Sequence, residues 1–400
     1  MQTNLNELFQ NFIEKPSLFT KKEALSPTYL PSTPLHREKQ IKQLGTILAP
    51  TLRNEHISNI MIFGWTGVGK TAVTKFVVNG LSTMAEKISA PIETIYINCK
   101  MEKINTEYRL LARVAEELGE KVPMTGLPTD RVYRTLFKTI NRASAHIIII
   151  LDEIDSMDQA SEGLYDLTRI NYELTSGART SIIGISNDLN FIDSIDSRVK
   201  SSFSGEELIF PPYNAIQLTD ILKQRAEEAF LPATLQPGVI EKCAALAAQE
   251  HGDARRALNL LRVAAEIADR TGSEKIREIH VQAAEERIDT ESISEVTRTL
   301  PKQTQTVLWS IFHLNEVKGE DLSTGDIYSH YSDTCRQIGL TPLTQRRVSD
   351  LISELDILGI ITAKIISKGR YGRTREISLS LGNKHILKLN QILSEELFME

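Results

Sequence analysis

Cysteine is scarce in this 400-residue chain: there are three, and they lie far apart in the sequence. Cys99, Cys243 and Cys335 form no CxxC pair, and the eight histidines show neither HxxH nor HExxH spacing. Disulfide frameworks and zinc fingers depend on closely spaced residues of these types. The sequence therefore predicts buried, reduced thiols and argues against the small disulfide-rich and zinc-finger classes.

Long apolar runs are also missing. The longest, around Ile147 to Leu151, is far shorter than the roughly 20 residues with which a helix crosses a bilayer. The N-terminal sequence MQTNLNELFQ lacks the basic and apolar regions of a signal peptide. We expect a cytoplasmic protein with no membrane partner.

Positive charge is not in excess either. Against 46 Lys and Arg stand 52 Asp and Glu, which gives a net charge of −6. A basic face is the usual electrostatic footprint of a nucleic-acid-binding protein, so any such site here has to be a local basic patch. The hydrophobic share of 41% is typical of a globular protein, and the length suggests two or three domains.

What the chain does contain begins with an alternation of strand and helix patterns up to about residue 210. Five short apolar runs have the length of buried strands, at 61–63, 94–98, 146–151, 181–186 and 207–210. Runs that are apolar on both faces, separated by amphipathic segments, are typical of a parallel sheet covered by helices on both sides. We therefore predict an α/β domain over residues 1–210, preceded by an extended arm that ends in YLPSTPLHRE.

The rest of the chain reads as two further regions. From 211 to 290 the strand patterns vanish and helical periodicity takes over, which predicts an all-helical subdomain. From 295 to 400 we expect helices near 302–317, after Ser323 and from Thr344 as an N-cap, followed by two strands, ITAKIIS and EISLSL. Three helices followed by a hairpin is the order of a winged helix.

The strongest motif is GWTGVGKT, which matches the P-loop pattern G-x-x-x-x-G-K-[ST] between an expected strand and an expected helix. Gly64, Gly67 and Gly69 let the backbone turn its amides towards phosphate oxygens. Lys70 can reach the β- and γ-phosphates of ATP, and the Thr71 hydroxyl can ligate Mg²⁺. We also predict nucleotide contacts from Val68, Ala72, Tyr213 and Arg225.

Acidic residues follow the next long apolar run. Asp152 and Glu153 come directly after HIIIIL, at the end of a parallel strand where ligands of such sheets bind. Asp152 is a candidate Mg²⁺ partner, and Glu153 a candidate general base that orients the attacking water. Asn187 ends the following strand and can contact the γ-phosphate or the water, although a turn asparagine is the simpler alternative.

Two arginines are candidates for reading the γ-phosphate. Arg255 follows a likely N-cap, Asp253, at the start of a helix of the second region, from which a guanidinium can reach back over the nucleotide. Arg198, in DSRVKSS, can act as an arginine finger on a neighbouring molecule's nucleotide. A surface salt bridge is the alternative for Arg198.

Together these motifs resemble the AAA+ ATPases and, within them, the archaeal replication initiators related to the origin recognition complex and its helicase-loading partner. PLHRE resembles the family's segment beside the adenine, and GWTGVGKT, IIIILDEID, GISN and GDARRAL resemble Walker A, Walker B, sensor 1 and sensor 2. The stretch from INCKMEK to GLPTD is similar to the helical insertion that initiators press against DNA. Clamp loaders share the ATPase motifs but usually end in a helical collar instead of a winged helix.

The resemblance implies an AAA+ P-loop core with a parallel five-stranded sheet, an all-helical lid and a C-terminal winged-helix domain. It implies ATP or ADP and Mg²⁺ as cofactors, with the roles given above for the six residues Lys70, Thr71, Asp152, Glu153, Asn187 and Arg255. It also places Arg198 in the family's finger-bearing segment. The implied partners are double-stranded origin DNA, the MCM replicative helicase and paralogous initiators, in a nucleoid-associated protein.

The hairpin supplies the local basic patch that the net charge requires. Between Lys364 and Arg375 no acidic residue occurs, and the tip carries Tyr371. An arginine-bearing hairpin can enter a minor groove, while the first turn of the third helix can present side chains to the major groove. The predicted DNA contacts are Arg346, Arg347, Lys368, Arg370, Tyr371 and Arg373. The alternative is a solvated hairpin whose charges only protect an edge strand.

Two functions remain open at this point. The first is a slow ATPase that initiates replication, binding origin DNA and helping to load the helicase. The second is a nucleotide-gated winged-helix regulator with little turnover, for which the same ATP site would suffice.

Overall fold

A computed structural model describes residues 17–123, 125–157, 161–191, 195–203, 205–319, 322–367, 373–380 and 383–398. The chain forms two compact units, Met1–Val281 and Gln282–Glu400. In the described part of the chain no helix is long and apolar enough to cross a membrane.

A five-stranded sheet forms the centre of the first unit, as the apolar runs predicted. Its strands are β1 (Ile60–Phe63), β2 (Ile92–Asn98), β3 (His146–Asp152), β4 (Arg179–Ser186) and β5 (Glu206–Ile209). All neighbours pair in parallel, in the order β2-β3-β4-β1-β5. The carboxyl ends of β1, β3 and β4 therefore meet at one edge of the sheet, where the P-loop, Asp152 and Asn187 follow them.

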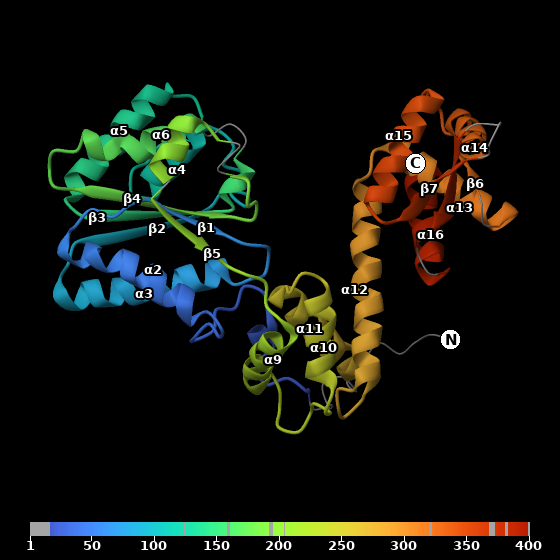
Figure 1. The fold of residues 1–400 in the computed structure, drawn as a ribbon, viewed down its shortest axis with the longest axis horizontal. Coiled ribbons are helices and arrows are strands. Elements are labelled where there is room, and N and C mark those ends of the chain that lie inside the picture. Colours follow the sequence, from blue (N-terminus) through green and yellow to red (C-terminus); the bar gives the residue numbers. More distant parts are fainter. Residues whose placement is uncertain are drawn as a thin grey trace, which may run out of the picture. The chain divides into compact units, whose positions relative to one another are not determined.

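Helices cover both faces of this sheet (Figure 1). One face carries α4 (Glu107–Glu117), α5 (Thr129–Ala143), α6 (Ser161–Arg169) and α8 (Ser197–Phe203), and the other carries α2 (Glu38–Leu48) and α3 (Lys70–Ile88). Strand β3 contributes to both cores: Ile147, Ile149 and Leu151 pack in one, and Ile148 and Ile150 in the other. This alternation buries the strand on both faces.

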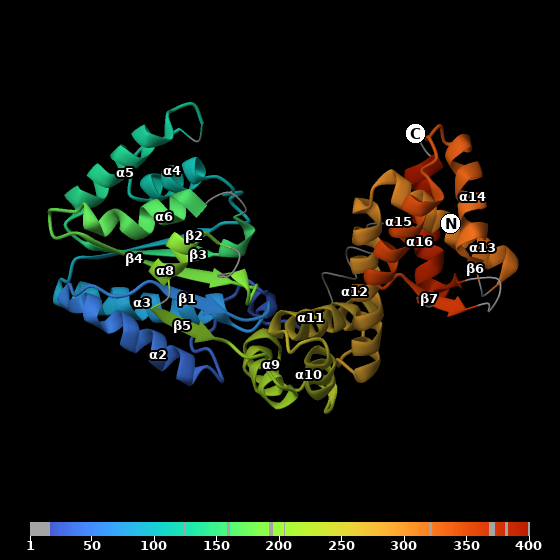
Figure 2. The ribbon, with the colours of Figure 1, turned by 45° about the horizontal axis from the view of Figure 1, so that its top comes forward.

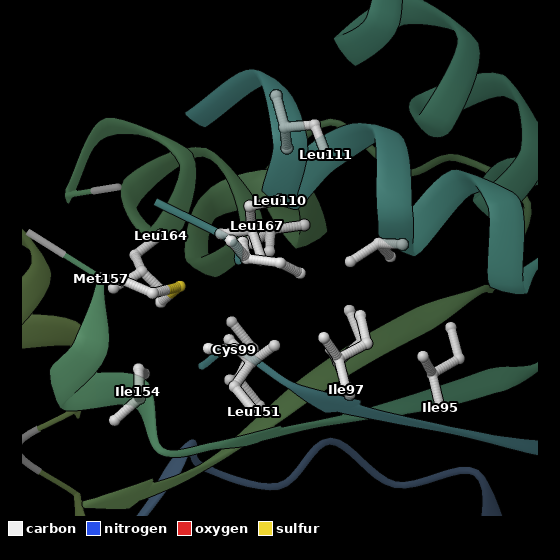
Figure 3. Packing of buried hydrophobic residues seen from close by; sticks show 14 of the residues in the cluster. Ile95, Ile97, Cys99, Leu110, Leu111, Leu151, Ile154, Met157, Leu164 and Leu167 are labelled. Atoms are coloured by element: carbon white, nitrogen blue, oxygen red, sulfur yellow. The ribbon is translucent and has the colours of Figure 1, made fainter. Parts of the chain in front are cut away.

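The core beneath α4 and α6 holds the sheet edge in place (Figure 3). There Leu151 and Ile97 of neighbouring strands lie in one cluster with Leu110 of α4 and Leu164 of α6. Helix α4 lies in the stretch that we compared with the initiators' insertion. Its apolar side is thus part of the domain core.

Three helices form the predicted helical subdomain, called the lid from here on: α9 (Ala215–Ala229), α10 (Val239–Gln249) and α11 (Ala254–Thr271) (Figure 2). Asn214 and Gln217 form a capping box at the start of α9. Asp253 caps α11, as predicted, by accepting from the amides of Arg255 and Arg256, and Gly272 in the left-handed region ends the helix.

The N-terminal arm is bound to the lid. It contains the short 3-10 helix η1 (Lys22–Leu25), and its Thr20 and Lys21 amides both donate to the carbonyl of Ala229. Outside the arm, the first unit contains three more short 3-10 helices, η2 (Ala49–Arg53), η3 (Ile154–Ser156) and η4 (Ile170–Tyr172). The bonds of Thr20 and Lys21 attach the arm to the end of α9. From residue 17 on, the arm is therefore packed against the lid, where the sequence had predicted an extended segment.

The second unit has the winged-helix elements. They are α13 (Lys302–Lys318), β6 (Leu322–Ser323), α14 (Thr324–Gln337), α15 (Gln345–Ile357), β7 (Ile361–Ser367) and β8 (Arg373–Leu379), with an antiparallel sheet in the order β6-β8-β7. The helix α12 (Glu278–Thr299) runs continuously through residues 290–295, where the sequence had suggested a boundary. A final helix, α16 (Asn383–Phe398), was not predicted; its Leu389, Ile392 and Leu393 complete the core of this unit.

Candidate functional site

The first unit contains a cavity of about 610 Å³ where the arm, the P-loop, the strand ends and the lid meet. Most of the predicted ATP-site residues line it: Gly67, Val68, Gly69, Lys70, Thr71, Ala72, Asp152, Glu153, Asn187, Tyr213, Arg225 and Arg255. Gly64 and Arg198 are not among its lining residues. Residues separated by almost 200 positions are therefore gathered around one space.

Glycine is required in the P-loop by close contacts as well as by backbone angles. Gly67 has φ +69, and a Cβ there would lie 1.6 Å from Oδ1 of Asp253. A Cβ on Gly64 would lie 2.6 Å from the carbonyl oxygen of Phe210. This close approach explains why position 64 needs glycine, although Gly64 does not line the cavity. Gly69, with φ +88, begins α3. A side chain at any of these three glycine positions would therefore collide with Phe210, Asp253 or Tyr213.

Lys70 is buried at the centre of the loop. Its ammonium donates to the carbonyl oxygens of Gly64 and Trp65 at 2.7 and 2.8 Å and to Oδ1 of Asn187 at 2.9 Å. Burial lowers the pKa of Lys70 to about 8, an effect that the Asp152 carboxylate opposes. The side chain is therefore a confined charge held by three oxygens, which phosphate oxygens can replace.

Asp152 and Thr71 form the candidate metal site. The Thr71 hydroxyl donates to Oδ2 of Asp152 at 2.7 Å, and the Asp152 side chain is almost fully buried. A hydroxyl and one carboxylate beside a phosphate loop are hard oxygen donors of the kind that suits Mg²⁺, which keeps several waters and binds substrate phosphates. These residues fit a nucleotide-bound Mg²⁺.

Glu153 follows with an unusual backbone. Its φ of +55 lies in the left-handed region, which is costly for a residue with a side chain. The strain turns the chain directly after β3 while keeping Glu153 on the cavity wall. Such outliers cluster at functional sites, which agrees with the role predicted for this carboxylate.

Asn187 and Arg255 approach from opposite sides. The backbone amide of Asn187 donates to Oδ1 of Asp155 at 3.2 Å, and this bond fixes the turn after β4. Arg255 lies exposed in the first turn of α11 and lines the cavity. Arg256, by contrast, forms an ion pair with Glu250 at 3.0 Å and does not line the cavity.

Sequence reasoning named only part of the far end of the cavity, the PLHRE segment at 34–38, and missed the residues before it. The arm supplies a mostly apolar wall there: Pro27, Thr28, Tyr29, Leu30, Pro31, Pro34 and Leu35. Arg37 is buried and donates to the carbonyls of Val68 and Pro211, with its guanidinium 3.8 Å from the ring centre of Tyr213. The PLHRE resemblance had already predicted a place beside the adenine for Pro34, Leu35 and Arg37, whereas for residues 27–31 the sequence signal was the nearby prolines.

Arg225, predicted to contact the nucleotide, is buried in the lid and lines this end of the cavity. Its Nη2 donates to the Tyr29 carbonyl, and its Nε and Nη1 have no hydrogen-bond partner among the residues that the structure describes. Burial lowers the pKa of Arg225. Buried unpaired donors are rare because they are costly, so a ligand in the cavity is their natural partner.

Arg198 lies away from this cavity, on α8. Its guanidinium is held by Asp196 at 2.8 Å and lies over the ring of Tyr165. The surface salt bridge that was the alternative for Arg198 is thus present. A role on a neighbouring molecule's nucleotide stays a prediction.

In the winged helix, Arg346 and Arg347 are exposed in the first turn of α15, after the Thr344 N-cap. The side chain of Arg346 makes no hydrogen bond or ion pair with the described residues, whereas the Arg347 guanidinium lies 3.7 Å from the carboxylate of Asp350 in its own helix. Three predicted contacts, Lys368, Arg370 and Tyr371, lie outside the described residues. Arg373 begins β8, but its side chain lies outside the described part as well.

Arg375 differs from the rest of the predicted basic patch. Its Nη1 donates to the Ser349 carbonyl and to the Ser353 hydroxyl, at 3.1 and 2.7 Å. These bonds connect β8 to α15. Arg375 therefore orders the hairpin against the helix, in addition to adding charge.

Models of known protein families match each of the three domains of this chain. The family model for the AAA domain matches residues 53–190, that for the Cdc6 AAA+ ATPase-type lid domain residues 219–286, and that for the CDC6 C-terminal winged helix domain residues 295–389. Together with the P-loop site, these matches define an AAA+ ATPase with a C-terminal winged helix.

Full-length relatives narrow the class. The chain is 51% identical over 386 residues to an ORC1-type DNA replication protein of Pyrococcus furiosus, covering 95% of this chain and 91% of the relative. It is 50% identical to ORC1-type DNA replication protein 1 of Methanosarcina acetivorans, and the match covers 94% of this chain and 91% of the relative. The structure of the Aeropyrum pernix ORC1 protein in complex with DNA matches with a TM-score of 0.80 and 45% identity, over 96% and 98% of the two chains. The chain belongs to the family of archaeal ORC1-type DNA replication proteins, as the motifs had indicated.

Proposed function

We propose that this chain binds and hydrolyses ATP, recognises origin duplex DNA and helps to recruit or load the MCM helicase. The observation that carries the ATPase part is that Lys70, Thr71, Asp152, Glu153 and Arg255 line a single cavity. The likeness to an ORC1 protein solved in complex with DNA supports the DNA part. Paralogous initiators are proposed as further partners.

In this proposal each side chain has one task at the phosphates. Lys70 exchanges its carbonyl partners for β- and γ-phosphate oxygens, and Asn187, released from Lys70, orients the attacking water. Glu153 accepts the proton of that water, and Arg255 stabilises charge on the γ-phosphate. Bound Mg²⁺, held by Thr71 and Asp152, would neutralise phosphate charge. In DNA-bound assemblies Arg198 would serve a neighbour's nucleotide.

Two variants test the ATPase. Lys70→Ala should abolish nucleotide binding, because no other lysine in the P-loop can replace that charge. Glu153→Gln should bind ATP normally and fail to turn it over. Glu93→Gln, on the exposed side of β2 outside the cavity, is the matched control and should keep normal turnover. Equal hydrolysis by Glu153→Gln and the control would remove Glu153 from the base role.

The winged helix is proposed to bind DNA through α15 and the hairpin, together with the insertion between β2 and β3. Arg346→Ala should weaken duplex binding and lower the salt dependence by about one phosphate contact. Lys318→Ala removes an equal charge from α13, where Lys318 is paired with Asp326. This control should leave duplex affinity and its salt dependence unchanged. The Arg370/Arg373 double alanine variant should weaken binding further. If it bound as tightly as wild type at moderate salt, the hairpin would not be part of the interface.

Footprinting the protein on the A·T-rich non-coding stretch beside its gene, with ATP and with ADP, separates the two candidate functions. An initiator should protect a defined site and retain MCM helicase on that DNA in pull-down. Nucleotide-dependent protection without measurable turnover or helicase retention would favour the regulator instead.

A further inference from the structure

Asp152 is held by a residue that none of the nucleotide-binding motifs contains. Tyr96 lies in the middle of β2, lines the cavity and donates its hydroxyl to Oδ2 of Asp152 at 2.7 Å. We propose that Tyr96 is a positioning residue for the magnesium site, which orients the Asp152 carboxylate for the metal. This inference rests on the proposed binding of ATP with Mg²⁺.

The placement of Tyr96 follows from the pairing of the strands. Strand β2 pairs with β3 so that Tyr96 is opposite Ile150 and Asn98 is opposite Asp152. Side chains two residues apart on neighbouring parallel strands point to the same face, so the long tyrosine can reach along the sheet to the carboxylate. A shorter side chain at this position would not span that distance.

Three donors together fix the carboxylate. Oδ2 of Asp152 accepts from both Tyr96 and Thr71 at 2.7 Å, and Oδ1 accepts from the Glu153 amide at 3.0 Å. The terminal torsion of an aspartate is broad when nothing holds it. With both oxygens bonded, the carboxylate plane has a defined direction before any cation arrives. Tyr96 is the only one of the three donors that comes from outside the Walker motifs.

The tyrosine ring is itself held from the other side. The ammonium of Lys75 lies 3.8 Å from the ring centre of Tyr96, and Lys75 is one turn beyond Thr71 on α3. A cation over an aromatic face is attracted to it, and this contact also keeps the ring edge pointing towards Asp152. Helix α3 therefore carries Thr71, a candidate metal ligand, and also Lys75. Lys75 in turn holds the Tyr96 ring next to Asp152, the second candidate ligand.

Hydrogen-bond partners of metal ligands commonly change metal affinity by about 10- to 100-fold when they are removed. Tyr96→Phe deletes only the hydroxyl and keeps the ring and its contact with Lys75. Its effect should appear in the Mg²⁺ dependence of nucleotide binding and not in binding measured without metal. A residue that only shaped the cavity would alter both.

The experiment titrates full-length protein with a fluorescent ATP analogue, first in EDTA and then at increasing Mg²⁺. We expect Tyr96→Phe to match wild type in EDTA and to need about 10-fold more Mg²⁺ for the half-maximal change in affinity. Tyr108→Phe is the matched control, because it removes one tyrosine hydrogen bond, to the Pro123 carbonyl, outside the cavity. Thermal unfolding of each variant checks that the domain is folded.

The results separate this inference from the function on which it rests. A wild-type protein with Mg²⁺-dependent binding and a Tyr96→Phe variant with the same Mg²⁺ midpoint would overturn the role of Tyr96 alone. Equal weakening of the variant in EDTA and in Mg²⁺ would also overturn it, since the hydroxyl would then act on the nucleotide pocket. No Mg²⁺ dependence in wild type would overturn both proposals.

Discussion

The N-terminal arm should control how fast the bound nucleotide leaves, and Tyr29 is the residue that tests this. Its ring lines the cavity, and its hydroxyl donates to Oε2 of Glu228 at 2.5 Å and accepts from Lys21. Its carbonyl accepts from Arg225, whose guanidinium also lies 4.7 Å from the ring centre. One residue of the arm is thus bound to the lid through backbone, ring and hydroxyl.

The Tyr29→Phe variant removes only the hydroxyl interactions. A hydrogen bond to a charged partner contributes about 1.5 to 3 kcal/mol, and the half-buried position of Glu228 puts the expected loss near the lower value. Since about 1.4 kcal/mol corresponds to a factor of ten, the population with an undocked arm should rise about tenfold. Local openings of this kind precede global unfolding, so the rest of the fold should stay intact.

Two measurements check the expectation. Hydrogen exchange at the Thr20 and Lys21 amides, both bonded to the Ala229 carbonyl, reports arm undocking directly. The consequence for the nucleotide is measured as the rate at which a fluorescent ADP analogue is released in a stopped-flow chase. This release rate should also rise about tenfold. Tyr172→Phe, at a highly exposed tyrosine of the same unit, is the control. Unchanged exchange would refute the role of the hydroxyl, and faster exchange with unchanged ADP release would refute the arm as the barrier.

Three further predictions concern the same unit. Burial lowers the pKa of Lys70 to about 8, so the ligand-free protein loses this positive charge as pH rises through 8; ADP affinity should therefore fall between pH 7 and 9 in fluorescence titrations. Gly67→Ala should weaken nucleotide binding by at least tenfold in the same assay, because its Cβ would collide with Asp253 and displace the lid. Burial also lowers the pKa of His146 to about 4, so the unfolded chain takes up the proton first as pH falls below about 6.5. Stability present at pH 7 should then fall by about 3 kcal/mol as the pH approaches 4, and His146→Gln should reduce this loss in urea unfolding.

The end of the cavity at the P-loop was predictable because its residues lie in short, contiguous sequence motifs. The glycines, Lys70 and Thr71 occur together, and Asp152 follows a run whose apolar character alone identifies a buried strand. The parallel order of the sheet then brings the strand ends to one edge, a consequence of topology that requires no knowledge of side-chain packing. The strand ranges therefore agreed with the structure to within a few residues.

The contacts at the far end of the cavity were not predictable by the same reasoning, although Arg225 and the PLHRE segment had been named. Tyr29 and Arg225 meet across almost 200 positions, and no local pattern specifies that contact. Tyr96 was hidden because a tyrosine within an apolar strand is also an ordinary core residue. Helix α16 did carry a signal, since Leu389, Ile392 and Leu393 repeat at helical spacing, but a winged helix is complete without it.

Contacts between the P-loop and the lid link the proposed role of Arg255 at the γ-phosphate to the position of the lid. The first amide of α11, that of Ala254, donates to the Gly67 carbonyl at 3.2 Å, and the indole of Trp65 stacks on His251 of the preceding turn. Arg255, which we propose reads the γ-phosphate, is the next residue of that helix, so its backbone cannot shift without disturbing these contacts. A lid that moves must therefore break its bond to the loop that holds the phosphates. For this reason we expect exchange of ATP for ADP to change lid orientation, and not merely the rotamer of Arg255.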